Sequence, residues 1–261
     1  MRDAPRFGGV NATDVVRPAL LDAAQLAALR TWTAEVEAWP AGSHRWGHYA
    51  EHTAHGPRIC RTENVSACHA GFASIVHGPL RAYAAVAIGE PVNAFKDKVN
   101  YKQPGVAGFS PHQDKVAYPG VERVISILLA VDDCSVESGC LWIAGGVDEV
   151  LAVDDRGVVR AEVSETLDWT AVELRAGDAL CIDGLAPHYS ETNRGNDARR
   201  VLVASYAPAA EGYARDDYYE RRRTRMQTDT ERDGRFRIST LADFEGTEVD
   251  ATSVTDHCTH L

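Results

Sequence analysis

The stretch Val92-Asn-Ala-Phe-Lys-Asp-Lys-Val-Asn-Tyr-Lys102 decides the fold class, because polar and apolar residues alternate along it. Side chains two positions apart on a strand lie on one face, and that face carries four polar residues here: Lys96, Lys98, Asn100 and Lys102. For Lys96 and Lys102 the pattern indicates contact with water. Lys98 and Asn100 lie in mid-strand, where the pattern fits a functional position and a solvated one equally.

Outward from this stretch, short β-branched segments bounded by Gly and Pro continue toward the C-terminus. Five more strands are predicted, over residues 123–131, 140–144, 170–174, 179–182 and 200–206. Short strands at regular spacing favour an antiparallel sandwich or jelly roll over a parallel βαβ sheet. We therefore predict a mainly β fold with a double sheet over residues 92–207.

Helices are expected before the sheet. Asp22 and Gln25 form a capping-box pair for a helix that Pro40 ends, and a second helix is predicted over residues 70–88. Helices in the region 19–89 need the sheet to bury their apolar stripes, so a single domain is predicted over residues 1–226. Residues 227–261 are charged and poor in large apolar groups, which indicates a partly mobile tail.

The segment 41–70 is polar and is expected to be a loop. It holds a series of histidines at spacings of 4, 4 and 3: His44, His48, His52 and His55. Gly and Pro residues among them argue against a helix that would gather them at a metal. We interpret the segment as a lid or entrance loop that lines a pocket. The basic run 221–225 is interpreted as a solvated helix face.

Composition excludes several classes of function. The 261 residues carry a net charge of -11, which argues against nucleic-acid and anionic-membrane partners. No apolar run is long enough to span a bilayer, and the first residues lack the apolar region of a signal peptide. Six cysteines without a C-x-x-C pair indicate reduced, mostly buried thiols. The expectation is a cytoplasmic protein, and its oligomeric state has no signature in the sequence.

The segment Ser110-Pro111-His112-Gln113-Asp114 places a His and an Asp on one face of an extended chain. A third ligand is available in His188, which follows a predicted strand 74 residues after Asp114 (188 − 114). Two imidazoles and one carboxylate leave coordination positions open and suit non-haem Fe(II). A structural zinc site would need four closed ligands, usually with Cys.

Arg199 comes directly before an apolar strand, 11 residues after His188 (199 − 188). An arginine on a core strand is costly unless it is paired, and a carboxylate is its natural partner. A dicarboxylate cosubstrate that chelates iron at one end would present its other carboxylate to Arg199. An internal salt bridge is the alternative. Arg200 should face the opposite side of the strand.

Several motifs together resemble the phytanoyl-CoA dioxygenase family of Fe(II)- and 2-oxoglutarate-dependent oxygenases. They are residues 98–102 with 105–109 and 111–114, Glu137-Ser138-Gly139-Cys140-Leu141 with Gly145, Ala176-Gly177-Asp178, and His188-Tyr189-Ser190 with Asn193, Arg199 and Arg200. The resemblance covers about residues 20–226 and implies a double-stranded β-helix, a cupin-like jelly roll. It also implies Fe(II), 2-oxoglutarate and O2 as cofactors and cosubstrates.

Carried over residue by residue, the resemblance makes His112, Asp114 and His188 the iron ligands and Arg199 the anchor of the distal carboxylate of 2-oxoglutarate. Ser190 would support that carboxylate, and three further residues are candidate contacts to the cosubstrate: Lys98, Asn100 and Ser110. Related halogenating enzymes replace the carboxylate ligand with a small residue. Asp114 is retained, so halogenation is not expected.

The reaction implied is oxidation of an unactivated C–H bond by hydroxylation, desaturation or oxidative ring closure. The local sequence resembles a bacterial branch acting on small polar metabolites, such as amino acids or aminophosphonates, in specialised biosynthesis. Candidate substrate residues are Trp46, Arg58, Gln113, Lys115, Tyr118 and Trp142. For three of them the alternatives are an outer or surface position (Gln113), a solvated charge (Lys115) and core packing (Trp142). A cupin-type metal enzyme without cosubstrate and a non-catalytic jelly-roll binding module stay as alternative functions.

Overall fold

The computed structural model describes residues 16–39, 46–53, 56–233 and 246–248, and side chains outside 52–53, 225–233 and 246–248. The first part of the chain forms β1 (Val16–Arg17), α1 (Ala23–Glu37), β2 (Gly47–Thr53), β3 (Gly56–Glu63), α2 (Ala70–Ile75), α3 (Arg81–Ile88) and β4 (Val92–Lys102). The second part forms β5 (Ile125–Ala130), β6 (Leu141–Ala144), α4 (Ala161–Ser164), β7 (Trp169–Val172), β8 (Ala179–Asp183), β9 (His188–Ser190), β10 (Arg199–Pro208), α5 (Arg215–Asp233) and β11 (Gly246–Glu248).

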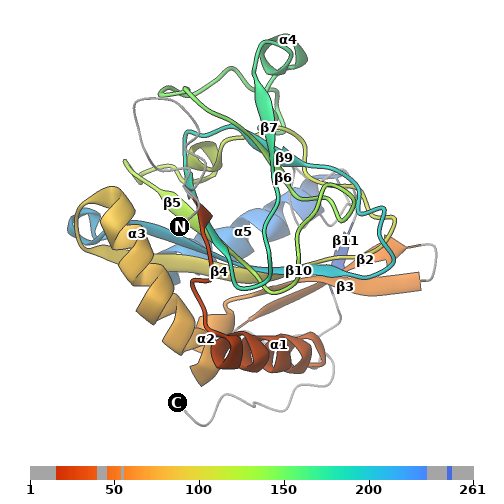
Figure 1. The fold of residues 1–261 in the computed structure, drawn as a ribbon. Coiled ribbons are helices and arrows are strands. Elements are labelled where there is room, and N and C mark those ends of the chain that lie inside the picture. Colours follow the sequence, from red (N-terminus) through yellow and green to blue (C-terminus); the bar gives the residue numbers. More distant parts are fainter. Residues whose placement is uncertain (1–15, 40–45, 54–55, 234–245, 249–261) are drawn as a thin grey trace.

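Two antiparallel sheets make the jelly roll. The large sheet has eight strands in the order β1-β8-β5-β10-β4-β3-β2-β11, and the small sheet has the order β7-β6-β9. Figure 1 shows the small sheet on one side of the large sheet and α1, α2 and α3 on the other. The predicted mainly β double sheet with flanking helices is therefore confirmed.

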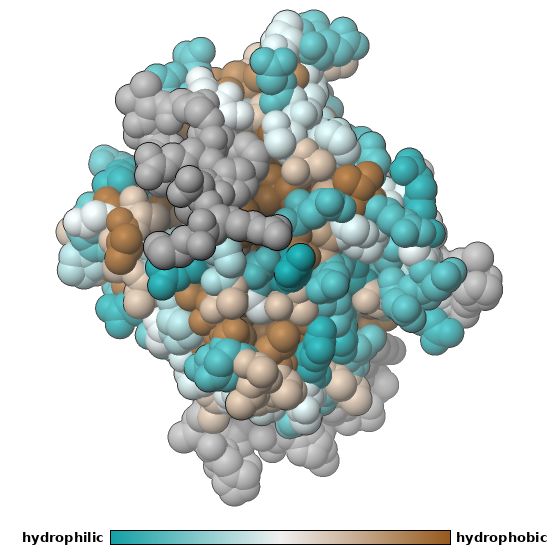
Figure 2. Space-filling model, in the orientation of Figure 1, coloured by the Kyte–Doolittle hydropathy of each residue, from teal (hydrophilic) through white to brown (hydrophobic). Residues whose placement is uncertain are grey.

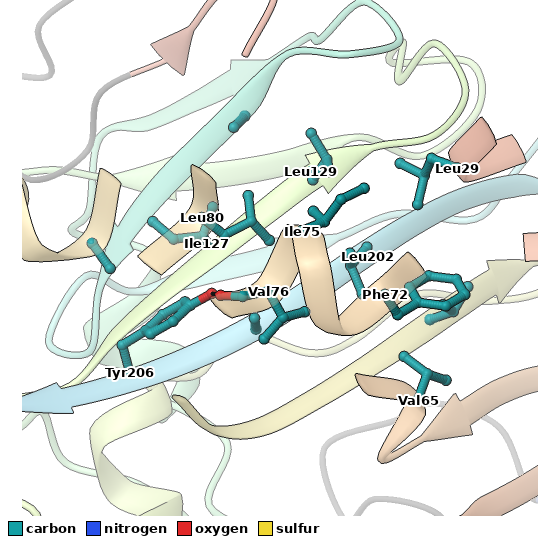
Figure 3. Packing of buried hydrophobic residues seen from close by; sticks show 14 of the residues in the cluster. Leu29, Val65, Phe72, Ile75, Val76, Leu80, Ile127, Leu129, Leu202 and Tyr206 are labelled. Carbon is teal, nitrogen blue, oxygen red and sulfur yellow. Dashed lines mark hydrogen bonds between the residues drawn. The ribbon is translucent and has the colours of Figure 1, made fainter. Parts of the chain in front are cut away.

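The helices and the large sheet enclose the main hydrophobic core. Figure 3 shows side chains of α1 and α2, such as Leu29 and Phe72, meeting Leu129 and Leu202 from β5 and β10. Each large apolar side chain buried in this way contributes roughly 1.5–3 kcal/mol. The capping box predicted for Asp22 and Gln25 is present at the start of α1. These contacts fix the large sheet, whose opposite face then points toward the small sheet.

The space between the two sheets has a dry end and a polar end. At the dry end, a second cluster joins the sheets through apolar side chains, among them Leu128, Ala130, Ile143, Leu180, Ile182 and Val201. The polar end is formed by the face of β4 that carries Lys96, Lys98, Asn100 and Lys102, together with neighbouring strands. The polar end is where the candidate site lies.

Two expectations about the first half of the chain are wrong. The predicted loop 41–70 contains β2 and β3, which pair with each other and, through β3, with β4. The predicted helix 70–88 is interrupted by a π-turn at Val76–Leu80, because Gly78 leaves helical geometry and Pro79 follows it. All six predicted strands are present with ends shifted by up to two residues, and β9 was missed because it has only three residues.

The predicted domain boundary at residue 226 falls inside α5, which runs to Asp233. The basic run on this helix is only partly solvated: Arg221 and Arg223 are exposed, whereas Arg222 pairs with Glu63 of β3. Arg215, at the start of α5, pairs with Asp97 of β4. Buried ion pairs thus fasten α5 to the large sheet.

Of the six cysteines, the five within the described ranges are free thiols, and four of them are buried. None of the helices in the described ranges is both long and apolar enough to cross a bilayer. Figure 2 shows hydrophilic and hydrophobic residues interspersed over the visible face, and the most exposed large hydrophobic side chains are two valines, Val86 and Val150.

Candidate metal and cosubstrate site

The three predicted metal ligands lie together at the polar end. His188 is the first residue of β9, and His112 forms a β-bridge with it through backbone hydrogen bonds of 2.9 and 3.0 Å. Asp114 follows at the start of a short 3-10 helix, Asp114–Ala117. Ligand atoms of the three side chains lie within 4.8 Å of one another. Residues 74 positions apart in the sequence thus converge because the β-bridge brings their segments side by side.

Both imidazoles are held in the orientation that a metal requires. His112 Nδ1 lies 2.7 Å from the Ser110 carbonyl oxygen, and His188 Nδ1 lies 3.0 Å from that of Ala186. A carbonyl accepts only, so each Nδ1 carries the proton and each Nε2 keeps its lone pair for a metal ion. The donor set of two Nε2 atoms and a carboxylate therefore fits Fe(II).

The protonation states agree with this assignment. Burial and the nearby His188 lower the pKa of His112 to about 3, so its imidazole is neutral at physiological pH. Burial alone would raise the pKa of Asp114, but the His188 imidazole, the Lys96 ammonium and a hydrogen bond from Ser126 together lower it. Ser126 donates that bond over 2.6 Å and orients the carboxylate. Neutral imidazoles and an ionised carboxylate are the forms that bind a metal.

Arg199 lies opposite Lys102 of β4, on the face of the large sheet that carries Lys98 and Asn100, and is 6% exposed. One guanidinium nitrogen donates to the Gly139 carbonyl over 2.7 Å, but Nε has no hydrogen-bond partner. Among the described residues, no carboxylate pairs with it, so the alternative of an internal salt bridge does not apply. Arg200, by contrast, points to the opposite face and makes a two-pronged pair with Asp132 at 2.7 and 2.8 Å.

Lys102 is a second buried cation beside Arg199. It is 8% exposed, and its ammonium donates to Ser190 Oγ over 3.0 Å and to the carbonyl oxygens of Gly139 and Glu191. Burial and the Arg199 charge lower its pKa to about 7. The predicted wet face is therefore wrong for Lys102, because the small sheet covers this end of β4. Arg199, Lys102 and Ser190 together suit the distal carboxylate of a dicarboxylate.

Two glycines allow the backbone to come close at this point. A Cβ at Gly108 would lie 1.6 Å from the Ser190 carbonyl oxygen, and one at Gly139 would meet Glu191 O at 2.5 Å and Lys102 Nζ at 2.9 Å. Gly139 also has a φ of +73°, which side chains disfavour. The glycines of the motifs 105–109 and 137–141 are thus needed for the approach of β9 to Lys102.

The other half of the β4 face is also cationic. Lys98 Nζ lies 5.9 Å from the centre of the Phe109 ring, and the guanidinium of Arg61 (β3) lies 5.6 Å from it. Burial and the neighbouring Arg61 and Lys96 charges hold the pKa of Lys98 well below its ordinary value. Lys96 is half-buried and hydrogen-bonds Tyr118 over 2.6 Å, so it does not lie on a wet face either.

Of the remaining predicted cosubstrate contacts, Asn100 and Ser190 use their side chains in the site, and Ser110 uses its backbone carbonyl. Asn100 accepts a hydrogen bond from Arg61 over 3.2 Å and lies between Lys98 and Lys102 on the site face. Ser110 contributes its backbone carbonyl to His112, and Ser190 Oγ accepts bonds from Lys102 and from the Phe109 amide. Asn100 and Ser190 therefore point a polar side chain at this region.

Three of the predicted substrate residues, Gln113, Lys115 and Tyr118, neighbour His112 and Asp114 in the sequence. Gln113 is 1% exposed, and its amide group bonds the backbone of Glu149, Leu151 and Leu185, so it braces loops and is not a surface residue. Tyr118 is buried between Lys96 and the Phe95 ring. Lys115 is half-buried, and its amide donates to the Gly184 carbonyl over 2.9 Å.

The other predicted substrate residues lie away from the triad. Trp46 contacts Trp39, which packs against the helix-covered core, and Arg58 is exposed on β3. Trp142 stacks on Tyr189 with ring centres 6.0 Å apart, on the outer face of the small sheet, since Ile143 and His188 face inward. Trp142 therefore packs rather than lining the site.

Within the described residues, the histidine series does not form a lid, because His48 and His52 lie in β2. His48 lies in β2 and bonds Thr62 over 3.0 Å on the helix-covered face. His44 and His55 lie outside the described residues, and for His52 only the backbone is described. Sequence reasoning missed four buried charges on the site face: Glu51, Arg61, Glu63 and Lys102. For Glu51 and Arg61 the missed signal was the alternation of β2 and β3.

The sequence profile of the phytanoyl-CoA dioxygenase (PhyH) family matches residues 14–201, which is more than half of the chain. The chain belongs to the phytanoyl-CoA dioxygenase family. Family membership confirms the expected enzyme class, a 2-oxoglutarate-dependent non-haem iron dioxygenase with Fe(II), 2-oxoglutarate and O2.

Among relatives in the phytanoyl-CoA dioxygenase family, two are named for phosphonates. Methylphosphonate hydroxylase of Gimesia maris is 37% identical over 90% of this chain and 93% of its own length. The 2-aminoethylphosphonate dioxygenase of an uncultured bacterium (HF130_AEPn_1) is 34% identical over 78% of this chain and 80% of its own length.

Solved structures support the fold of this phytanoyl-CoA dioxygenase family member. EctD from S. alaskensis with bound Fe superposes with a TM-score of 0.65 at 18% identity, covering 77% of this chain and 75% of EctD. The epimerase SnoN, solved with Fe3+ and alpha-ketoglutarate, gives a TM-score of 0.62 at 23% identity, covering 76% of this chain and 80% of SnoN. At these identities the likeness establishes the jelly-roll fold alone.

Proposed function

We propose that this protein oxidises a C–H bond of a small phosphonate, in a reaction that converts 2-oxoglutarate and O2 to succinate and CO2. In the hydroxylating form of the reaction, one oxygen atom enters the substrate as a hydroxyl group and the other enters succinate. The two relatives named for phosphonates motivate the choice of substrate. The observation that carries it is an excess of buried and half-buried cations beside the metal triad.

The charge balance at the polar end favours an anionic substrate. Arg61, Lys96 and Lys98 lie on neighbouring strands, and Glu63 is the carboxylate that pairs with Arg61, at 3.2 Å. Glu63 is already shared with Arg222, which lowers its pKa to about 2 despite burial. Lys98 forms no ion pair with a carboxylate of the described chain. A phosphonate, with three oxygens and up to two negative charges, would satisfy this excess.

The protein's own residues would each have a definite part in this reaction. His112, Asp114 and His188 would hold Fe(II), which with bound 2-oxoglutarate and O2 supplies the oxidant for the C–H bond. Arg199 and Ser190 would hold the distal carboxylate of 2-oxoglutarate, and the charge of Lys102 beside them would stabilise it. Arg61 and Lys98 would hold the phosphonate, and the Phe109 ring between them would exclude water from one side.

An amino-acid-like carboxylate is the second candidate substrate, because Arg61 and Lys98 would also bind a carboxylate. Matched compounds separate the two. Methylphosphonate and 2-aminoethylphosphonate differ from acetate and β-alanine, respectively, chiefly in the acidic group. We expect succinate release above background with a phosphonate and not with its carboxylate counterpart. Release with β-alanine or a free amino acid alone would overturn the proposal in favour of the second candidate.

A substitution at Lys98 tests where the phosphonate group binds. Lys98→Met should raise the KM for the phosphonate by about tenfold or more, since one charge-assisted contact is lost. The KM for 2-oxoglutarate should stay within about twofold. A raised KM for 2-oxoglutarate with an unchanged KM for the phosphonate would instead make Lys98 a cosubstrate contact, as the family resemblance implies.

A further inference from the structure

Glu51 is a buried carboxylate on β2 that has no partner among the described residues. It is 1% exposed, and neither of its carboxylate oxygens accepts a hydrogen bond. Burial of an unpaired carboxylate costs several kcal/mol, so such a group is normally removed or paired. The activity described above assigns it no part.

Strand register places Glu51 on the site face of the large sheet. Tyr49 is opposite Arg61, and Arg61 is opposite Asn100 of β4. Glu51 is two residues beyond Tyr49 on β2 and therefore shares its face. The side of β2 that carries Glu51 therefore belongs to the face of the large sheet that carries Arg61, Asn100 and Lys102, while Lys98 lies opposite Glu63 on the other side of Arg61.

Two buried cations whose charges act on Glu51, Lys102 and Arg61, hydrogen-bond other groups, and the residue opposite Glu51 on β3 is the exposed Arg58. The Lys102 ammonium has three protons and three acceptors, Ser190 Oγ and the carbonyls of Gly139 and Glu191. Arg61 donates through Nε to Asn100 and through Nη1 to Glu63, both at 3.2 Å. Their charges lower the pKa of Glu51, but burial outweighs them and raises it to about 7. Two positive charges therefore act on Glu51, but no described group donates a hydrogen bond to its carboxylate.

We propose that Glu51 receives the ammonium group of a zwitterionic substrate, so that the enzyme selects an aminoalkylphosphonate over an alkylphosphonate. The proposal rests on the function proposed above, in which the phosphonate group lies against Arg61 and Lys98. Arg61 lies opposite Tyr49, two residues before Glu51 on β2, and contacts the same Phe109 ring as Lys98, so the cation-binding and anion-binding groups lie on either side of Arg61. An ammonium offers three charge-assisted donors to the two unfilled oxygens.

The competing explanation is that Glu51 only balances the charges of Lys102 and Arg61. In that case its loss would disturb the site for every substrate alike. A role in binding an ammonium group would instead appear as a change in preference between two phosphonates that differ in that group. The ratio of the two affinities therefore separates the explanations.

The test compares Glu51→Gln with the wild type and with Glu162→Gln, which changes an exposed carboxylate on α4. Each protein is loaded with Fe(II) and 2-oxoglutarate without O2, and methylphosphonate and 2-aminoethylphosphonate are titrated in by calorimetry. Succinate release with O2 then gives kcat/KM for the same pairs. Glu51→Asp, which keeps the charge, serves as a rescue variant, and thermal unfolding checks that each variant is folded.

In Glu51→Gln we expect affinity for 2-aminoethylphosphonate to fall about 10- to 100-fold, with affinity for methylphosphonate within about twofold. Glu51→Asp should keep part of the preference, and Glu162→Gln all of it. An equal loss for both phosphonates, or no loss for either, overturns the role of Glu51 while leaving the proposed function intact. Wild-type protein that binds and oxidises neither phosphonate contradicts the proposed function itself.

Discussion

Two buried carboxylates of the large sheet are equally hidden from water and differently bound. Asp97, on β4, is 0% exposed, and its oxygens accept bonds from the amide and hydroxyl of Ser66 and from Arg215. Glu51, on β2, is 1% exposed and accepts none. Asp97 belongs to what we call the closed cluster: Asn64, Ser66, Asp97, Arg215 and Tyr219.

The polar end of the jelly roll has the opposite character, and we call it the open cluster: Glu51, Lys98, Lys102, Arg199 and the triad His112, Asp114 and His188. Its members are buried or half-buried, and within the described residues neither Glu51 nor Arg199 forms an ion pair or fills all of its polar atoms. Arg215 of the closed cluster also leaves Nη1 without a hydrogen bond, but its charge is paired with Asp97. A buried charge that is paired within the protein stabilises the fold. A buried charge without a protein partner is available to bind a ligand. The two clusters should therefore respond oppositely to substitution.

The largest effect is expected at the metal triad. His112→Ala should lower kcat/KM by at least about 100-fold, because the donor set loses a nitrogen that two backbone bonds and the Ser110 carbonyl hold in place. Bound iron, measured after gel filtration, should fall with it. Unfolding of the metal-free protein should be nearly unchanged. Retained iron and activity would contradict the assignment of the triad.

The closed cluster should instead affect stability. Asp97→Asn leaves the Arg215 guanidinium without its charge partner and should lower the unfolding free energy by about 3 kcal/mol or more. Glu51→Gln removes an unpaired charge and should cost much less. Urea unfolding followed by circular dichroism measures both variants. Equal losses of unfolding free energy in Asp97→Asn and Glu51→Gln would contradict the distinction between the two clusters.

A pH series sharpens the same contrast. In the folded protein the pKa of Glu51 is raised by burial from 4.5 to about 7, so the folded state keeps a proton that the unfolded chain releases. The contribution of Glu51 to stability therefore falls as pH rises from 4.5 to 7 and then levels off. Relative to Glu51→Gln, the wild type should lose about 3 kcal/mol across this window. Parallel pH profiles would mean that Glu51 titrates normally.

The smallest effect is expected outside both clusters. Trp142, a candidate substrate residue for which core packing was the alternative, stacks on Tyr189 on the outer face of the small sheet. Trp142→Phe preserves an aromatic ring there and should change kcat/KM by less than about twofold. A loss of tenfold or more in kcat/KM would mean that substrate binds on the outer face of the small sheet, outside the candidate site.

Local patterns in the sequence were sufficient for much of the fold. Alternation along Val92–Lys102 and the Asp22–Gln25 capping box act between near neighbours, and both elements appear where they were expected. β2 and β3 were missed because their polar and charged residues, such as Glu51 and Arg61, are buried only after the sheet has formed. The pairing that buries them links residues 39 positions apart, as between Arg61 and Asn100.

The site residues also divide into those that local sequence patterns predicted and those that they did not. His112, Asp114, His188 and Arg199 carry a spacing that could be found in the sequence, and they lie on one face of the roll. Lys102 looked like a solvated residue, since nothing in the alternation of β4 reveals that the segment following β9 covers it. Which buried charges remain unsatisfied depends on the positions of all neighbouring donors and acceptors. Only the three-dimensional structure contains that information.

The adjacent arginines of β10 give the most direct test of the central claim that unfilled buried charges mark ligand positions. 2-Oxoglutarate is titrated without O2 into Fe(II)-loaded wild type, Arg199→Ala and Arg200→Ala, and the visible charge-transfer band of the chelate is followed. Because Arg199 is open and Arg200 is closed by Asp132, affinity should fall about 10- to 100-fold in Arg199→Ala and stay within about twofold in Arg200→Ala. Equal affinities in the two variants, both folded and loaded with iron, would contradict the account.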